Sequence, residues 1–441
     1  GSQTYNDNVT IANNPTLAGN GITFNETVDG NSNLTLNAGT GNLKLDGAVN
    51  LNSLTTTAAN TNIANNITTA GNQRFTGAVN LTGNNAKTFN STNNDISFSS
   101  TLNGTNTDFT LNAGTGNLTF GNTVAVKSLN TTAANINVPN NITTTDIQQF
   151  TGGVTLTGNN AKTFNSTNSN INFSSTLNGT DTDLTLNAGT GNLTFGNAVA
   201  VKSLNTTAAN INVPNNITTT GIQQFTGGVT LTGNNAKTFN STNNNINFSS
   251  TLNGTSAGNK NLTVDSGTGK VSFEGIVGGI AALGDLAVNS TGITKFGSTV
   301  TANSLTTNTG GTTEIGGDIT TTGKQTYGDG VNVKNPAKLT TTNSEVAFNS
   351  TVDGNKNLTV DSGTGNVSFE GIVGGIAALG DLAVNSTGTT KFGNTVTAKS
   401  LTTNTGGTTE IGGDITTTGK QTYGDGVNVK NPAKLTTTNS E

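Results

Sequence analysis

Apolar and polar residues alternate at both ends of the stretch that runs from Asn117 to Val138, NLTFGNTVAVKSLNTTAANINV. Leu118-Thr119-Phe120 and Ile136-Asn137-Val138 each place two apolar side chains on one side of an extended backbone and one polar side chain on the other. Between such triplets stand Gly, Asn and Thr, and Gly and Asn tolerate the backbone angles of tight turns. The stretch therefore predicts short strands that are buried on one side and joined by turns.

Sequence motifs of this kind return along the chain at fixed intervals, which is the pattern of a repeat architecture. NAGTGNL begins at Asn37, Asn112 and Asn187, which defines a 75-residue unit. NKNLTVDSGTG begins at Asn259 and again at Asn355, which defines a 96-residue unit. The chain therefore contains two families of repeats.

A shorter period is present inside both repeats. Apolar-x-apolar triplets end at Phe120, Val138, Leu156, Phe173 and Phe195, with successive steps of 18, 18, 17 and 22. Four such steps make the 75-residue unit and five make the 96-residue unit, because 75/4 and 96/5 are both about 19. A ladder of 23 apolar positions follows this period through the chain. We therefore expect about 23 coils of about 19 residues, with Phe120, Val138, Leu156 and Phe173 stacked in one column.

These intervals also predict the domain organisation. We expect a single continuous β-solenoid over 1–441, with four-coil, 75-residue repeats over 34–258 and five-coil, 96-residue repeats over 259–441. Glu441 corresponds to Glu345, after which the first copy continues as VAFNSTVDG. The second 96-residue repeat is therefore expected to be truncated, and the array to continue.

About three alternating triplets per coil predict an all-β fold in which the chain goes around a triangular core and returns one strand spacing higher. Helical solenoids have longer repeats, of about 33 to 47 residues, and no helical stripe of apolar residues appears here. Stacked coils also offer amide ladders, provided that neighbouring coils place Asn at the same phase as Asn112 and Asn187. The fold class that we predict is a right-handed parallel β-helix, its hand inferred from the preference of parallel crossovers.

Composition excludes several functions. Cys and His are absent, so thiolate or imidazole metal sites and a Ser-His-Asp triad are excluded. Lysines stand singly and the net charge is -5, which argues against a nucleic-acid groove. No apolar run approaches the ~18 residues of a membrane helix. We therefore predict no enzyme activity, no catalytic, cofactor-binding or metal residues, no nucleic acid and no membrane insertion.

Three sets of polar residues are candidates for sites. Asp181 and Asp183, with Asp108 one repeat before Asp183, are a weak calcium candidate because the D-x-D-x-D-G loop is missing, and solvated turns are the preferred interpretation. Asn-x-Ser/Thr sequons abound in a chain so rich in Asn and Thr, and a glycan on some of them remains open, among them Asn90, Asn117 and Asn165. Lysines recur in AKTF once in each 75-residue unit, and we expect them to lie on a solvated face: Lys87, Lys162 and Lys237.

The stretch SLTTNTGGTTEIGGDITTTGKQTYGDGV, which begins at Ser304 and again at Ser400, together with the LTLNAGTGNLTF runs, resembles the repeat regions of filamentous-haemagglutinin-like exoproteins and autotransporter passengers. The resemblance covers nearly the whole chain. It implies a secreted or cell-surface bacterial protein, associated with the outer membrane, that serves as the shaft of an adhesin. Expected partners are neighbouring repeats and, through a tip outside this segment, host or matrix glycans or proteins.

Two other functions are alternatives. A polysaccharide-binding or polysaccharide-cleaving protein of the pectin-lyase type shares the β-helix, but its site should break the repeat, and no such break is apparent among the acidic residues. A flat ice-binding face would need Thr-x-Thr at one phase in successive coils, whereas the triplets vary among LTF, INV, VTL and INF. The adhesin shaft is the preferred hypothesis.

Overall fold

The computed structural model describes residues 1–256 and 260–439, and every regular element in those ranges is a β-strand. Asn259, where the second repeat family was expected to begin, and Glu441 lie outside the described residues. The chain is a parallel β-solenoid of about 22 turns, with equivalent strands about 20 residues apart, which confirms the predicted all-β, parallel β-helix class. In the described ranges no helix is long and apolar enough to cross a membrane.

The chain forms two compact units, Gly1–Asn212 and Val213–Glu441. The single continuous solenoid over 1–441 stays a prediction. The first unit contains the strands β1 (Gln3–Tyr5), β2 (Val9–Thr10), β3 (Thr16–Ala18), β4 (Ile22–Phe24), β5 (Val28–Asp29), β6 (Asn33–Asn37), β7 (Asn42–Leu45), β8 (Val49–Leu51), β9 (Ser53–Ile63), β10 (Ile67–Thr69), β11 (Gln73–Leu81), β12 (Lys87–Ser91), β13 (Ile96–Phe98), β14 (Leu102–Asn112), β15 (Asn117–Thr119), β16 (Val124–Val138), β17 (Ile142–Thr144), β18 (Gln148–Leu156), β19 (Lys162–Ser166), β20 (Ile171–Phe173), β21 (Leu177–Asn187), β22 (Leu193–Thr194) and β23 (Val199–Val213), whose last residue belongs to the second unit.

The second unit contains the remaining strands, which are β24 (Ile217–Thr219), β25 (Gln223–Leu231), β26 (Lys237–Ser241), β27 (Ile246–Phe248), β28 (Leu252–Gly254), β29 (Leu262–Gly267), β30 (Val271–Phe273), β31 (Leu283–Ser290), β32 (Ile293–Phe296), β33 (Val300–Thr307), β34 (Thr312–Ile315), β35 (Ile319–Thr321), β36 (Gln325–Tyr327), β37 (Gly330–Val333), β38 (Ala337–Thr341), β39 (Val346–Phe348), β40 (Val352–Asp353), β41 (Leu358–Gly363), β42 (Val367–Phe369), β43 (Leu379–Ser386), β44 (Thr389–Phe392), β45 (Val396–Thr403), β46 (Thr408–Ile411), β47 (Ile415–Thr417), β48 (Gln421–Tyr423), β49 (Gly426–Val429) and β50 (Leu435–Thr437).

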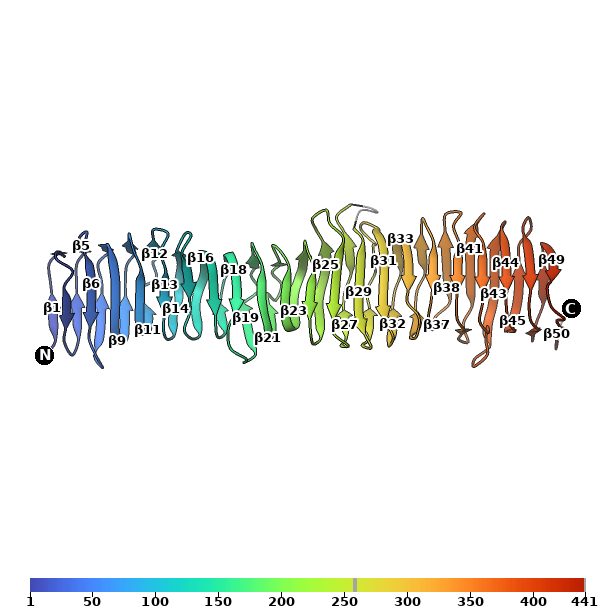
Figure 1. Cartoon of the computed structure of the whole chain (residues 1–441), viewed down its shortest axis with the longest axis horizontal. Helices are drawn as coiled ribbons and strands as arrows, with labels where there is room; N and C mark the ends of the chain where they lie inside the picture. The colour runs from blue at the N-terminus through green and yellow to red at the C-terminus, as the bar shows by residue number, and fades with distance from the viewer. Residues whose placement is uncertain (257–259, 440–441) are drawn as a thin grey trace. The chain divides into compact units, whose positions relative to one another are not determined.

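Each turn contains three strand segments, after which the next segment pairs with the first one. Ile67 in β10 pairs with Phe89 in β12, one turn later in the chain, and the two segments of β11 lie between them in sequence. The start of β11 pairs with β13 and its end pairs with β14, always in parallel. Within each unit, Figure 1 shows strands of successive turns lying side by side. The alternation read from the sequence is present in β13, where Ile96 and Phe98 are buried.

The predicted column is correct for three of its four members. Thr119 pairs with Asn137 and Val138 pairs with Leu156, so Phe120, Val138 and Leu156 share one face. Phe173 does not continue this column: it pairs with Phe150, at a ring distance of 5.1 Å. The step from Leu156 to Phe173 is shorter than a turn and passes to the neighbouring face.

The 75-residue unit spans three and two-thirds turns, not the four that we expected. A column that starts at Phe75 passes through Phe98 and Phe120 and reaches Leu156 after four turns. Phe150 is the equivalent of Phe75 in the next copy and comes six residues before Leu156, on the preceding strand segment. The second copy therefore begins on a different face of the solenoid, namely the face that precedes, in chain order, the face on which the first copy begins.

The 96-residue unit shows the same offset, with four and two-thirds turns instead of five. The column of Tyr327 reaches Val429 after five turns, through Phe348, Phe369, Phe392 and Ile411. Tyr423, the equivalent of Tyr327 in the next copy, comes six residues before Val429 and pairs with Thr403. The two repeat units therefore differ by one complete turn.

A left-handed turn repeats at one corner and explains an obligatory glycine. Asn93 has φ of 57°, and Gly114 lies on it in the next turn, also with φ of 57°. A Cβ on Gly114 would lie 2.3 Å from the Asn93 side-chain oxygen, which instead accepts a hydrogen bond from Thr115 N at 3.1 Å. The same pair recurs as Asn168 and Gly189. A side chain cannot replace glycine here without a clash.

Stacked phenyl rings offer a direct test of the register. Phe273 is buried between Phe248 at 5.1 Å and Phe296 at 5.4 Å. Phe273→Ala should lower the free energy of unfolding by about 3–5 kcal/mol, because the cavity removes contacts with both neighbouring turns. Urea denaturation followed by circular dichroism measures this. Val429→Ala, at a half-exposed position, should cost about 0.5 kcal/mol or less, and equal costs for both variants would contradict the stack.

Candidate functional site

Outward-facing asparagines bond from one turn to the next. Asn112 Nδ2 donates to Asn90 Oδ1 at 2.9 Å, and Asn187 Nδ2 donates to Asn165 Oδ1 at 2.7 Å. This confirms the amide ladders that the sequence suggested for Asn112 and Asn187. A ladder uses the donors and acceptors of its amides within the solenoid.

Charged side chains also pair between neighbouring turns. Lys127 Nζ lies 2.8 Å from an Asp108 carboxylate oxygen, and Ser128 Oγ donates to the other oxygen at 2.7 Å. Hydrogen bonds from Lys127 and then from Ser128 hold the pKa of Asp108 below its usual value. Asp183 has the same two partners one repeat later, Lys202 and Ser203. These pairs are largely exposed, so each contributes little stability.

The weak calcium candidate is not assembled. Asp183 holds Lys202 and Ser203, whereas Asp181 stands exposed on the rim of a groove. Asp108 belongs to the previous copy and has its own lysine. Within 1–256 and 260–439, no cluster of three or more acidic side chains could hold a metal ion.

The three AKTF lysines were expected on a solvated face, and this was wrong. Lys87, Lys162 and Lys237 are each only 1% exposed. Lys162 Nζ donates to the carbonyl oxygens of Gly158 at 3.2 Å and Asn160 at 2.9 Å. Burial lowers the pKa of all three ammonium groups. The signal was present in the sequence, because the lysine stands two residues before a buried phenylalanine and therefore shares its inward side.

The sequon asparagines take part in contacts between turns. Asn90 and Asn165 accept the ladder bonds described above, and Asn117 Nδ2 donates to Asp95 Oδ1 at 3.2 Å. Asn117 Oδ1 also accepts from Asn135 at 3.1 Å. A sugar on Asn117 Nδ2 would disturb its bond to Asp95, and glycosylation stays a hypothesis.

Asp329 is the buried carboxylate of the QTYGDGV motif, and its exposed fraction is only 1%. Its oxygens accept from Gly311 N at 2.9 Å and from Thr313 Oγ1 at 3.2 Å. Burial raises the pKa of Asp329, and these two hydrogen bonds oppose the rise only in part. Tyr327 beside it in sequence is fully buried and donates to Gln325 Oε1 at 2.9 Å. The motif is a satisfied polar element of the core.

Two equivalent polar grooves lie in the first unit, with volumes of about 230 and 270 Å³. Asn, Thr and Gly dominate both linings, and Asp181 stands in one where Asn106 stands in the other. They are one 75-residue copy apart and therefore open on different faces. The offset prevents them from forming one continuous binding track.

One groove of about 570 Å³ departs from the repeat, contrary to the expectation that no break exists. Arg74 and Asp95 both line it. The next copy has Gln149 and Asn170 at these positions, and Gln149 Nε2 donates to Ser174 Oγ at 3.0 Å. Sequence analysis missed this site although the signal was present in the sequence. Arg74 is the single arginine of the chain, and Asp95 is an acidic residue that the later copies replace by Asn170 and Asn245.

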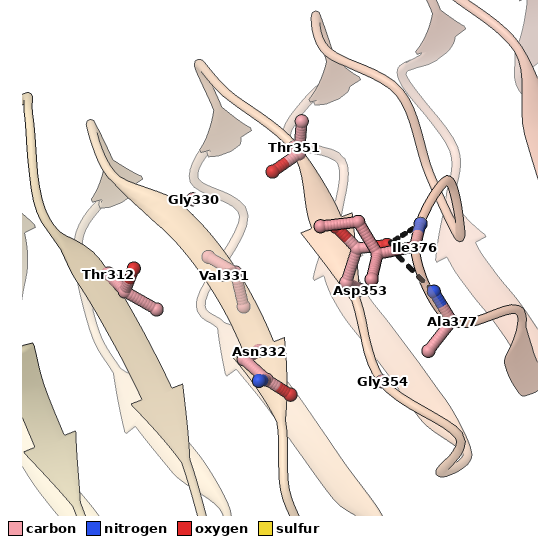
Figure 2. Close-up of a pocket in the computed structure, with 9 residues that line it drawn as sticks. All are labelled: Thr312, Gly330, Val331, Asn332, Thr351, Asp353, Gly354, Ile376 and Ala377. Atoms are coloured by element: carbon pink, nitrogen blue, oxygen red, sulfur yellow. Dashed lines mark hydrogen bonds between the residues drawn. The ribbon is translucent and has the colours of Figure 1, made fainter.

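A further recess lies in the second unit beside the loop that follows Val373, and its volume is about 230 Å³. Figure 2 shows Asp353 facing the backbone nitrogens of Ile376 and Ala377. Asp353 Oδ1 accepts from Ile376 N at 2.8 Å and from Ala377 N at 3.3 Å. The Asp353 carboxylate thus fixes the loop at the side of the recess.

Comparison with protein-family models, with curated proteins and with solved structures found no match to this chain. The resemblance to filamentous-haemagglutinin-like exoproteins therefore rests on the repeat residues alone.

Asp329→Asn should test the buried carboxylate through the pH dependence of stability. Because its pKa is raised by folding, the protonated carboxyl favours the native state at acid pH, and this contribution is lost as pH rises through the raised value. The free energy of unfolding of the wild type minus that of the variant should therefore fall as pH increases from about 3 to 7. Urea titrations at several pH values measure the difference.

Asp381→Asn is the matched variant of opposite sign. A hydrogen bond from Ser400 is the largest cause that lowers the pKa of Asp381, so wild type minus variant should rise with pH over the same range. Equal slopes for the two variants would contradict the assignment.

Proposed function

We propose that this chain is part of the structural shaft of a secreted or cell-surface bacterial adhesin or fibre, where it holds a binding tip outside this segment away from the cell. The observation that carries the proposal is that a repeat never equals a whole number of turns. The 75-residue copies and the 96-residue copies both return one face back, so the same surface motif is presented on successive faces.

This arrangement suits a shaft better than an extended binding face. A surface that recognises a long flat partner needs equivalent groups on one face in successive turns, whereas here the equivalent grooves open on different faces. Many outward asparagines, aspartates and lysines are also engaged with the neighbouring turn, as in Asn112 with Asn90. These outward polar side chains therefore stabilise the stacking of the turns.

Location, partners and the lack of catalysis are parts of the same proposal. Repeats stack on one another within the chain. Export to the bacterial surface, association with the outer membrane and contact of the tip with host or matrix glycans or proteins follow from the resemblance of the repeats. We assign no enzymatic activity to the shaft.

The groove at Arg74 favours a second candidate, a polysaccharide-binding or polysaccharide-cleaving protein. It is the place where a guanidinium and a carboxylate replace two amides of the repeat, and Thr55, Ser97 and Thr119 line the same groove. Arginine pairs well with the carboxylates of acidic sugars.

Deletion of residues 113–187 tests whether the repeats act as exchangeable shaft segments. The deletion removes one 75-residue copy, and Asn112 then precedes Ala188 as it now precedes Ala113. The shortened chain should fold, and its melting temperature should change by no more than about 2–4 °C, because each turn contacts only its neighbours. Thermal unfolding followed by circular dichroism measures it.

Deletion of residues 113–182 is the matched control. It removes five fewer residues, and an odd displacement turns inward side chains outward unless the extra residues loop out. This control should unfold at a clearly lower temperature. If the 75-residue deletion unfolds as early as the control, the segments are not exchangeable.

Polygalacturonate distinguishes the two candidate functions. The full chain should release no oligosaccharide from it and should bind it no better than Arg74→Gln/Asp95→Asn, which restores the amides of the other copies. Product analysis and binding by calorimetry are the measurements. Cleavage or binding that this double variant abolishes would assign the polysaccharide function instead.

A further inference from the structure

Two equivalent loops of the second unit carry isoleucines in solvent. Ile280 is 88% exposed and Ile376 is 92% exposed, and they are one 96-residue repeat apart. Each stands four residues after another exposed isoleucine, Ile276 or Ile372. Single exposed apolar residues are common, but here two such residues and the alanines that follow share one loop.

The loops are held in place. Val373 bridges Val352 and Val396 in neighbouring turns, and Gly374 N donates to Val352 O at 2.7 Å. A Cβ on Gly374, whose φ is 68°, would lie 2.1 Å from Thr397 O. The Asp353 carboxylate then fixes Ile376 N. The loop backbone is therefore already ordered, and a contact through the isoleucine would cost no further backbone conformational entropy.

The first loop is anchored in the same way. Ile280 N donates to Asn253 Oδ1 at 2.9 Å, and Asn253 stands at the position of Asp353. Val277 bridges Leu252 and Val300, as Val373 bridges its own neighbours. The exposed tip is therefore a property of the repeat.

The second loop offers both parts of a self-complementary contact. Beside Ile376 lies the recess of about 230 Å³ (Figure 2). Its lining combines Val331, Ala377 and two glycines with polar side chains, which are Thr312, Asn332, Thr351 and Asp353. An isoleucine from another copy could enter it while Ile376 enters the recess of that copy. Such a two-fold exchange is the usual form of contact between identical chains.

The two loops point in different directions, and this favours other copies of the chain over a lipid surface as the binding partner. The column of the first loop runs from Val300 through Ile319 and Leu339 to Val360, whereas the second loop lies on Val352, on another face. A flat lipid surface could meet only one of them. Neighbouring copies placed around the solenoid could meet both.

We propose that the isoleucine loops 275–284 and 371–380 are lateral contacts between copies of this chain, in which the isoleucine tip of one copy enters the recess of another. One loop covers much less than the roughly 800 Å² per partner of a stable interface. A single contact is therefore weak, and association grows with the number of loops that engage together.

Sedimentation velocity of the full chain from micromolar to near-millimolar concentration tests the proposal. The weight-average sedimentation coefficient of the wild type should rise with concentration, and that of Ile280→Ser/Ile376→Ser should stay constant. Ile147→Ser/Ile222→Ser is the matched control, because it makes the same change at isoleucines that are 41% and 45% exposed outside the loops. It should associate like the wild type.

A cysteine experiment tests the geometry, and the chain contains no cysteine of its own. Ile376→Cys protein mixed with Thr351→Cys protein should form the mixed disulfide under mild oxidation at least tenfold faster than Ile222→Cys mixed with Thr351→Cys. Thr351→Lys, which places a charge at the recess while both isoleucines remain, should abolish the rise in sedimentation coefficient.

Three results would overturn the proposal. One is a wild type whose sedimentation coefficient stays constant over the whole range. The second is association that survives Ile280→Ser/Ile376→Ser. The third is a monomeric chain that binds phosphatidylcholine vesicles through these isoleucines, which would assign the loops to lipid. Circular dichroism of each variant confirms that the fold is retained.

Discussion

Stacking of parallel strands at about 4.8 Å is the constraint on which the rest of this structure depends. Each strand residue lies beside its register partner in the turns above and below, so inward side chains contact inward side chains and outward side chains contact outward side chains. Inside, Phe273 meets Phe248 and Phe296. Outside, Asn112 meets Asn90. The low apolar content is sufficient because a side chain that stacks on two neighbours needs no partner from elsewhere in the chain.

The mismatch between repeat and turn has a structural consequence. Phe75 and Phe150 are equivalent in sequence but lie on different faces, and the same is true of Tyr327 and Tyr423. The same sequence must therefore fit any face, which requires the three faces to have similar shape and depth. Addition or loss of a copy turns everything after it by one face and creates no new kind of contact.

Much of the fold was predictable because strand alternation and turn residues are local signals. Which apolar triplets stack in one column was not predictable in the same way. Apolar-x-apolar triplets from all three faces look alike, so Leu156 and Phe173 appeared to be successive members of one column although only the pairing register places Phe173 over Phe150. The short step between these two residues was the one local sign of a change of face. The right-handed sense of the coil stays a prediction.

The prediction that the AKTF lysines lie on a solvated face was wrong for a different reason. Lys162 was judged by its charge, whereas its position two residues before Phe164 determines its direction. Its ammonium reaches the carbonyl oxygens of the turn that precedes it, so the cost of burial is reduced by hydrogen bonds. Residue type alone could not reveal those acceptors, because their direction is set by the conformation of the turn.

The same constraint indicates where binding partners should be sought. Where a polar side chain bonds to the turn above or below, a ligand must first break that bond, and this competition weakens binding. Among the described residues, Arg74 and Ile376 are two positions at which the side chain forms no such bond to a neighbouring turn. Arg74 stands where Gln149 bonds to a serine, and Ile376 has no neighbour of its kind because its loop leaves the stack. Recognition is therefore easier at such departures than on the regular faces, whose groups already stabilise the solenoid.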